Sequence, residues 1–350
     1  MYIVRKILYG ILVLYGVATL VFFLFNIIPG DPVRMMLGQR ADEKDVQVIR
    51  SELGLDKPVV QQYLGYINDL SPLSFYREGN QTLSKVKYIR ILRVGEVSVV
   101  AKTPYLRYSY QSRRGVGNIL CEAFPNTLLL ALVAMGFATV IGLVIGTFAA
   151  VVDSDWINRL TLFVTTLGMS LPSFFAAILV AYIFGFVFTD ITGLSMTGSL
   201  YSVDDYTGET CLNLRNLILP SLTLGLRPLA VITELVRTSL LETMSMDYIR
   251  TAKAKGLSKG RTVAVHALRN ALTPVVTAVS GWFASLLAGA VFVEYVFDWK
   301  GIGVVIVNAL NTFDFPVIIG SVLLIGMMLV VINIIVDIIY GVLDPRVRLS

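Results

Sequence analysis

Long runs of uncharged residues constrain this chain more than any other feature of its sequence. Five runs, each longer than about 20 residues, contain no Asp, Glu, Lys or Arg. A helix rises 1.5 Å per residue, so about 20 apolar residues are needed to cross the hydrocarbon core of a membrane. Core helices of soluble proteins are usually shorter and have a polar face. The sequence therefore predicts a polytopic helical membrane protein, with spans in residues 7–28, 123–152, 160–189, 271–293 and 315–336.

A sixth apolar segment, residues 216–236, is interrupted by Arg227 and Glu234. We count it as a further span, which gives an all-α fold with six transmembrane helices. The first run follows Arg5 and Lys6, as the apolar region of a signal peptide would. Such regions are only about 7–15 residues long, so we expect an uncleaved first span.

The composition agrees with a membrane protein. Hydrophobic residues make up 55% of the chain and charged residues 15%, against about 45–50% and about 25% in ordinary soluble domains. This composition excludes a disordered, collagen-like or disulfide-dense protein. The formal net charge of +5 would suit a nucleic-acid-binding protein, so the positions of the charges have to decide.

The positions of Lys and Arg predict the orientation of the spans. If the N-terminus is cytoplasmic, twelve basic residues fall in cytoplasmic segments, and only Arg215 and Lys300 fall in the short outer loops. Short cytoplasmic loops are enriched in basic residues, so both ends are expected inside, and the basic excess requires no nucleic acid. The twelve residues are Arg5, Lys6, Arg159, Arg237, Arg250, Lys253, Lys255, Lys259, Arg261, Arg269, Arg346 and Arg348.

The outer segment between the first two spans is too long for a simple connection. Residues 42–70 have apolar side chains at helical spacing, with Pro58 between two stretches. Residues 82–110 alternate and contain β-branched runs, which indicates a small strand pair that turns near Gly95. We expect four regions: the N-terminus and first span (1–28), an outer segment with a small mixed subdomain and an insertion around 73–107 (29–122), a five-span core with a cytoplasmic loop at 237–270 (123–343), and a cytoplasmic tail (344–350).

Residues suited to catalysis or metal binding are scarce. The chain has one histidine, His266, and two cysteines, Cys121 and Cys211, which cannot form a metal cluster. It has no glycine-rich loop with Lys and Ser or Thr to hold a nucleotide. We expect no catalytic residue, no metal and no cofactor in this chain. Both cysteines fall on the outer side, where an oxidising compartment would allow them to pair, although free thiols are the expected state.

The cytoplasmic loop from Arg237 is the most informative stretch. Ser245 and Asp247 suit the start of a short helix, and Gly256 suits a left-handed stop. Ser258 can begin a second helix that runs through His266 to Asn270. The short helix presents Tyr248, Ile249, Ala252 and Leu257 as a docking surface; the alternative is a solvated basic loop that merely follows the positive-inside rule.

This loop resembles the cytoplasmic signature loop of permease subunits from binding-protein-dependent ABC importers of the dipeptide, oligopeptide and nickel class. Six further stretches resemble landmarks of that family in the same order. The family's common Pro is replaced here by Lys300, and its usual short glycine-rich link in the outer segment is missing. The stretches are residues 29–32 (PGDP), 53–58 with Gln62 and Tyr63, 125–128 (PNTL), 170–174 (SLPSF), 293–297 (VEYVF) with 301–303 (GIG), and 343–346 (LDPR).

The resemblance implies the ABC importer permease fold and a bacterial inner-membrane location. It also implies a homologous second permease, two cytoplasmic ATPase subunits that bind ATP and Mg, and an outside substrate-binding protein. The expected cargo is a short peptide, with nickel or another metal complex as second choice. A secondary transporter or channel is the alternative from another class, although inverted repeats and paired intramembrane carboxylates are not found. The implied ATPase-coupling residues are Met246, Asp247, Tyr248, Arg250, Thr251, Ala252, Lys253, Ala254, Lys255, Gly256 and Leu257.

Three residues in the spans are candidates for the translocation path. Arg227 and Glu234 are seven residues apart and point the same way along a helix, and intramembrane charges usually face a cavity or a partner. Arg227 can attract a peptide carboxylate; the alternatives are a structural pair with another helix or a side chain that reaches the interface. Pro172 interrupts the third span, for gating or for ordinary packing. Gly142 and Gly146, four apart, allow close approach of a neighbouring helix.

Overall fold

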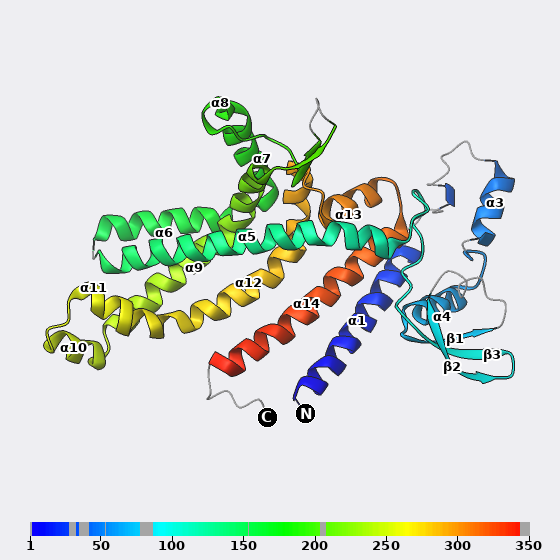
Figure 1. Cartoon of the computed structure of the whole chain (residues 1–350), viewed down its shortest axis with the longest axis horizontal. Coiled ribbons are helices and arrows are strands. Elements are labelled where there is room, and N and C mark those ends of the chain that lie inside the picture. Colours follow the sequence, from blue (N-terminus) through cyan, green and yellow to red (C-terminus); the bar gives the residue numbers. More distant parts are fainter. Residues whose placement is uncertain are drawn as a thin grey trace. The chain divides into compact units, whose positions relative to one another are not determined.

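The computed structural model describes residues 2–27, 33–34, 42–52, 54–77, 87–152, 154–203 and 208–343. The sequence landmarks at 29–32 and 344–346, and most of the stretch at 78–87, lie outside these ranges. The chain divides into two compact units, one of residues 1–123 with 305–330 and one of residues 124–304 with 331–350. Figure 1 shows the helices and strands of each unit.

The described residues contain five helices that are long and apolar enough to cross a membrane, and six spans if one bent pair counts as one. The segment around Arg227 is among the five, as predicted. The predicted third span is the bent pair: α6 (Asp155–Ser170) and the apolar helix that follows it meet at 107°. The five helices are Arg5–Leu24, Val116–Val151, Leu214–Met244, Lys259–Leu287 and Phe315–Ile338.

The larger unit is built around α9 (Ile218–Met244), which packs against both α6 and α12 (Leu268–Phe297). Its α7 (Ser173–Tyr182) packs on α9 and α12. The remaining elements are most of α5 (Val116–Val151), η2 (Ile183–Val187), α8 (Thr189–Thr192), a hairpin of β4 (Tyr201–Val203) and β5 (Thr210–Leu212), η3 (Leu214–Leu217), α10 (Asp247–Ala254), α11 (Lys259–Arg261), η4 (Thr262–Ala267), the first residues of α13 (Ile302–Asn311) and the end of α14 (Phe315–Leu343).

Two glycines of α5 allow α9 to approach closely, as their spacing predicted. A Cβ atom added at Gly146 would lie 2.6 Å from the carbonyl oxygen of Thr233, and one at Gly142 would lie 2.9 Å from a methyl group of Ile232. Both distances are shorter than ordinary van der Waals contact. The pairing of α5 with α9 therefore depends on the missing side chains.

The smaller unit contains α1 (Tyr2–Ile27), the outer subdomain and the first part of α14. The predicted helical stretch forms α3 (Glu43–Glu52) and α4 (Val59–Leu70). The predicted strand pair is β2 (Tyr88–Val94) and β3 (Val97–Lys102), which turn at Gly95 with φ of +61°. A third strand, β1 (Leu73–Arg77), pairs antiparallel with β3 and was not predicted.

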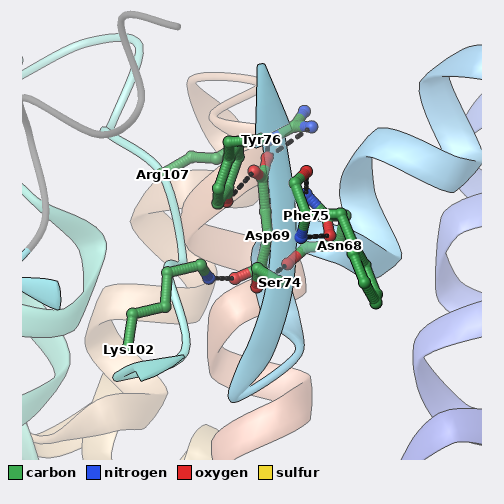
Figure 2. Close-up of polar contacts among 7 residues, drawn as sticks. All are labelled: Asn68, Asp69, Ser74, Phe75, Tyr76, Lys102 and Arg107. Atoms are coloured by element: carbon green, nitrogen blue, oxygen red, sulfur yellow. Dashed lines mark hydrogen bonds and ion pairs between the residues drawn. The ribbon is translucent and has the colours of Figure 1, made fainter. Parts of the chain in front are cut away.

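The buried carboxylate of Asp69 connects several elements of the outer subdomain (Figure 2). Asp69, at the end of α4, accepts hydrogen bonds from the Tyr76 hydroxyl of β1 and from Nε and Nη2 of Arg107, all at 3.1 Å. Its main-chain oxygen accepts from the ammonium of Lys102 in β3. Burial lowers the pKa of Lys102, although the charge of Asp69 acts to raise it. One residue thus ties the helix, the sheet and the connection to α5.

The cysteines are both exposed and free. Cys121 lies in α5 and Cys211 in β5.

Substitution of Gly146 tests the close approach of α9. We expect Gly146→Ala to lower thermal stability, because overpacking typically costs about 1–3 kcal/mol. Gly136→Ala in the same helix is the matched control, since no atom lies within 4 Å of a Cβ placed there. Fluorescence-detected unfolding in detergent measures both variants. Equal unfolding temperatures for the two variants would contradict the close contact.

Candidate functional site

The predicted cytoplasmic helix is α10, which Figure 1 shows with α11 beyond the ends of α9 and α12 (yellow-green to yellow). Helix α9 ends at Met244, and the Ser245 hydroxyl donates to the carbonyl of Glu242 at 2.7 Å. Ser245 therefore ends α9. The prediction that it starts the short helix is wrong. Met246 occupies the N-cap of α10 without a side-chain hydrogen bond, and Asp247 lies in the first turn.

Two apolar side chains anchor α10 to its own chain. Ile249 is fully buried and Ala252 is 7% exposed, and both pack where α10 meets the helical segments around it. The prediction that Ile249 and Ala252 form a docking surface is therefore wrong. They are on the inner face of a two-turn helix, and short helices depend on such packing for stability. Ile249 belongs to a buried cluster with Leu240, Val263, Ala267 and Ala271.

The outer face of α10 is polar and open. Asp247 and Arg250 form an exposed ion pair at 3.4 Å, and Tyr248 accepts a hydrogen bond from the Asn270 amide at 2.8 Å. Leu257 is half-buried. The exposed members of the predicted coupling set are Met246, Asp247, Tyr248, Arg250, Thr251, Lys253, Ala254, Lys255 and Gly256.

Gly256 ends α10 in the left-handed conformation, with φ of +80°, as its position predicted. Its amide donates to the carbonyl of Lys253 at 3.0 Å, and the next amide, of Leu257, donates to Ala252 at 3.4 Å. These two bonds satisfy carbonyls at the end of the helix. A side chain at this position would strain the backbone, because L residues other than glycine rarely adopt it.

The second half of the loop returns directly to the membrane. The Ser258 hydroxyl accepts from the amide of Arg261 at 3.5 Å, which confirms the predicted helix start. The chain continues through η4, which contains His266, into α12 without a break. The ammonium of Lys259 donates to the carbonyl of Val151 at 2.8 Å, at the end of α5.

Arg227 lies beside the break between α6 and α7. Its Nε and Nη2 groups donate to the carbonyl of Met169 at 3.4 and 3.3 Å. In a continuous helix that carbonyl would accept from the amide of Ser173, but Ser173 already begins α7. Pro172 is the N-cap of α7 and has no amide hydrogen to continue α6. The guanidinium thus replaces a lost intrahelical bond, and it is exposed without a carboxylate partner among the described residues.

Glu234 pairs with a residue one turn away in its own helix. Its Oε1 lies 3.1 Å from a guanidinium nitrogen of Arg237, and the Nε of Arg237 donates to the Asn158 side chain at 3.2 Å. Both charged side chains are largely buried. Arg227 and Glu234 are not in contact, as expected from their separation, and Glu234 pairs within its own helix and not with another helix.

Two of the predicted landmarks meet at the far end of α12. Glu294 is fully buried, and its Oε2 accepts from the amide of Gly303 at 2.6 Å. Thr127 accepts from the amide of Ile302 at 2.8 Å. In the turn before it, the Asn126 amide donates to the carbonyl of Lys300 at 2.7 Å, and the main-chain oxygen of Asn126 accepts from the Trp299 indole at 3.0 Å. A Cβ at Gly301 would clash with the Glu294 carboxylate. The glycines therefore allow the chain to close over Glu294.

Comparison with known proteins decides the family. The model of the binding-protein-dependent transport system inner membrane component matches residues 142–349, and the N-terminal model of the same membrane components matches residues 1–131. The chain belongs to this family. It is a permease subunit of an ABC importer and a multi-pass inner-membrane protein, and not a catalytic subunit.

Curated relatives match along nearly their whole length. The chain is 37% identical to the di/tripeptide transport system permease DppB of Pseudomonas aeruginosa, over 95% of this chain and 94% of the relative. It is 34% identical to the dipeptide transport system permease DppB of Escherichia coli K12, over 99% and 98%. It is 33% identical to the glutathione transport system permease GsiC of the same strain, also over 99% and 98%.

A solved structure shares the fold of this permease. A chain of the MetNI methionine ABC transporter matches with a TM-score of 0.52 at 18% identity, over 65% of this chain and 96% of that chain. Membership in the ABC importer family implies ATPase and binding-protein partners in general, and it excludes the secondary transporter that the sequence left as an alternative. The described part of the permease contains no group of three or more His, Cys, Asp or Glu placed to hold a metal.

Sequence reasoning identified the stretches around Glu294 by resemblance but gave the glutamate no role. Burial raises the pKa of Glu294 to about 7, although hydrogen bonds from Thr127 and from the Gly303 amide act to lower it. The ordinary value is 4.5. Between these two values the folded permease keeps a proton that the unfolded chain has lost, so stability falls as the pH rises through this window.

Replacement of Glu294 tests this titration. We expect Glu294→Gln to remove most of the loss of stability between about pH 5 and pH 8, a difference on the order of 3 kcal/mol, because glutamine cannot ionise. Thermal unfolding at several pH values measures it. Glu242→Gln, at an exposed position of α9, is the control and should keep the pH dependence of the unsubstituted permease. Parallel curves for Glu294→Gln and the unsubstituted permease would show that another group titrates.

Proposed function

We propose that this permease carries short peptides across the bacterial inner membrane. The observation that carries the proposal is the near full-length similarity to permeases named for di- and tripeptides, dipeptides and glutathione. These substrates share a peptide backbone with at least one free carboxylate. Nickel complexes are the less favoured cargo, because the described residues offer no metal-binding group.

The exposed face of α10 is the proposed contact with a cytoplasmic ATPase subunit. The helix is anchored by Ile249 and Ala252, so a force on its outer face would be transmitted to the ends of α9 and α12. Arg250, Lys253 and the nearby Tyr248 offer charges and a ring for recognition. The predicted coupling set keeps its role except for Ala252, which supports the helix from inside.

The proposed assembly follows the ABC importer plan. A homologous permease pairs with this chain, two ATPase subunits bind ATP and Mg on the cytoplasmic side, and a binding protein delivers the peptide from outside. Both ends of the permease are cytoplasmic, in agreement with the distribution of Lys and Arg. ATP then shifts the population of membrane conformations by favouring one arrangement of the α10 contact.

Arg227 is the proposed contact for the peptide carboxylate. It is the exposed charge of α9 at the helix break, and a carboxylate is the partner that a guanidinium binds best. Pro172 supports this site by ending α6 where the carbonyl of Met169 faces the guanidinium. Glu234 is proposed to hold α9 against α6 through Arg237 and Asn158, outside the peptide path.

Substitution of Gly256 tests the coupling contact. We expect Gly256→Val to reduce peptide uptake by about tenfold while ATP hydrolysis and membrane insertion remain, because the left-handed stop costs about 1–2 kcal/mol for an L residue. Uptake and hydrolysis are measured in vesicles that contain the complete transporter. Gly260→Val, at an exposed position without steric contacts, is the matched control. Unchanged uptake in Gly256→Val would exclude this role for α10.

Arg227→Gln tests carboxylate recognition. We expect uptake of a free dipeptide to fall by about tenfold, because a charge-assisted hydrogen bond is lost, while uptake of its C-terminal amide changes little. A purely structural effect on Met169 would lower both substrates alike. Arg215→Gln, which removes a charge from an outer loop, is the control and should leave uptake of both the free dipeptide and its amide unchanged. Equal losses for acid and amide would reject the contact.

A further inference from the structure

The smaller unit contains a cavity that the proposed function does not use. Its volume is about 90 Å³, and it is partly open to solvent, so part of a larger ligand can enter it. One part of the wall comes from α1 and α14 and is apolar, with Phe22, Phe315, Ile319 and Leu323. The other part comes from α4 and the connection before α5 and contains Leu70 and Leu106 together with the polar side chains Gln62, Tyr66, Tyr105, Arg107 and Tyr110.

Both spans contribute to the apolar wall with the ends that are expected at the same surface of the membrane. Phe22 is close to the end of the apolar span Arg5–Leu24, and Phe315 begins the span Phe315–Ile338. The ends of these two apolar spans therefore predict that the cavity lies at the edge of the hydrocarbon region, next to the headgroups. An amphiphilic molecule is the kind of ligand that matches such a wall.

Tyr66 is a buried donor that lacks an acceptor. It is 6% exposed, and its hydroxyl has no hydrogen-bond partner among the described residues. The ring is fixed by stacking on Phe22, with centroids 5.3 Å apart, and by the guanidinium of Arg107, 5.8 Å from its centroid. Burial raises the pKa of Tyr66, so the hydroxyl keeps its proton. Buried polar groups are nearly always bonded, so this hydroxyl calls for a ligand oxygen.

Arg107 gives the polar wall a positive group. It is held by two hydrogen bonds to Asp69 (Figure 2), and its side chain is 38% exposed. The segment that follows is fixed to the start of α14, because Asp314 accepts from the amide of Tyr110 at 3.0 Å and from the hydroxyl of Ser109. The wall is thus preformed.

The outer side of α4 indicates where the lipid surface lies. Tyr63 faces α1 and bonds to Thr19 at 2.8 Å and to Tyr15 at 3.0 Å. Val60 and Leu64 are 67% and 60% exposed on the same helix. A helix that packs on the end of a span and leaves apolar side chains uncovered is typical of the membrane interface.

We propose that this cavity binds one glycerophospholipid of the outer leaflet. The acyl chain lies along Phe22, Ile319 and Leu323, the Tyr66 hydroxyl donates to a phosphate or ester oxygen, and Arg107 attracts the phosphate. The lipid would fill the space between the outer subdomain and the spans of the same unit. It would therefore link the subdomain to the bilayer.

Tyr66→Phe tests the headgroup contact by removing one oxygen atom. We expect the affinity for phosphatidylglycerol to fall about fivefold, because one buried hydrogen bond is lost. Native mass spectrometry of the assembled transporter, titrated with phosphatidylglycerol, measures the bound lipid. Tyr63→Phe is the matched control on the same helix, and its hydroxyl already has partners within the chain. Equal lipid affinity for Tyr66→Phe and Tyr63→Phe would overturn the proposal.

Leu323→Trp is a second variant that fills the apolar wall and leaves the hydrogen bonds intact. We expect it to exclude the same lipid while peptide uptake stays unchanged. Inorganic phosphate, used as a separate probe, should show no change in binding at this site. A photoreactive side chain at Leu55, which lines the cavity, should cross-link to phospholipid in vesicles. Cross-linking to peptide or to the binding protein, or binding of phosphate alone, would overturn the lipid assignment.

Discussion

The guanidinium of Arg227 bonds to a carbonyl that the break at Pro172 leaves without an intrahelical partner. Hydrocarbon offers no water to satisfy main-chain groups, so a broken span needs such a substitute. A side chain of α9 thereby stabilises the bend of 107° between α6 and the helix that begins at Ser173. Because α9 is continuous from Ile218 to Met244, the same helix reaches the cytoplasmic loop about 25 Å away along its axis.

The same constraint explains the buried carboxylates at the other end of the spans. Glu294 accepts the amide of Gly303 where α12 turns into α13, and Asp314 accepts an amide and a hydroxyl where α13 turns into α14. Each acid replaces bonds that a turn removes from the backbone. Asp314 accepts from the Ser109 hydroxyl and from the amides of Tyr110 and Gln111. Glu294 leaves Oε1 without a partner in the described chain, and burial is the largest cause of its raised pKa.

The sequence predicted the features that depend on local chemistry. The length of the uncharged runs predicted the spans. Gly256 predicted the end of α10, and Gly95 marked the turn between β2 and β3. The spacing of Gly142 and Gly146 predicted the close approach of a helix to α5. It failed where tertiary partners decide. Ile249 was placed outside because periodicity gives a face but not its neighbour, and β1 was missed because its pairing depends on a distant strand. The i,i+3 spacing of Glu234 and Arg237 could have revealed their pair.

Helix α10 has only two turns, which is too short to be stable in isolation. Its rigidity therefore comes from its contacts with α9, η4 and α12 and from the fixed stop at Gly256. The proposed ATPase contact would act on a helix that is packed against the ends of α9 and α12. A push on the polar face reaches Ile249 and then Leu240 of α9, and α9 carries Arg227. In this proposal, carboxylate binding at the helix break and the ATPase contact at the cytoplasmic loop both act on α9, one continuous helix.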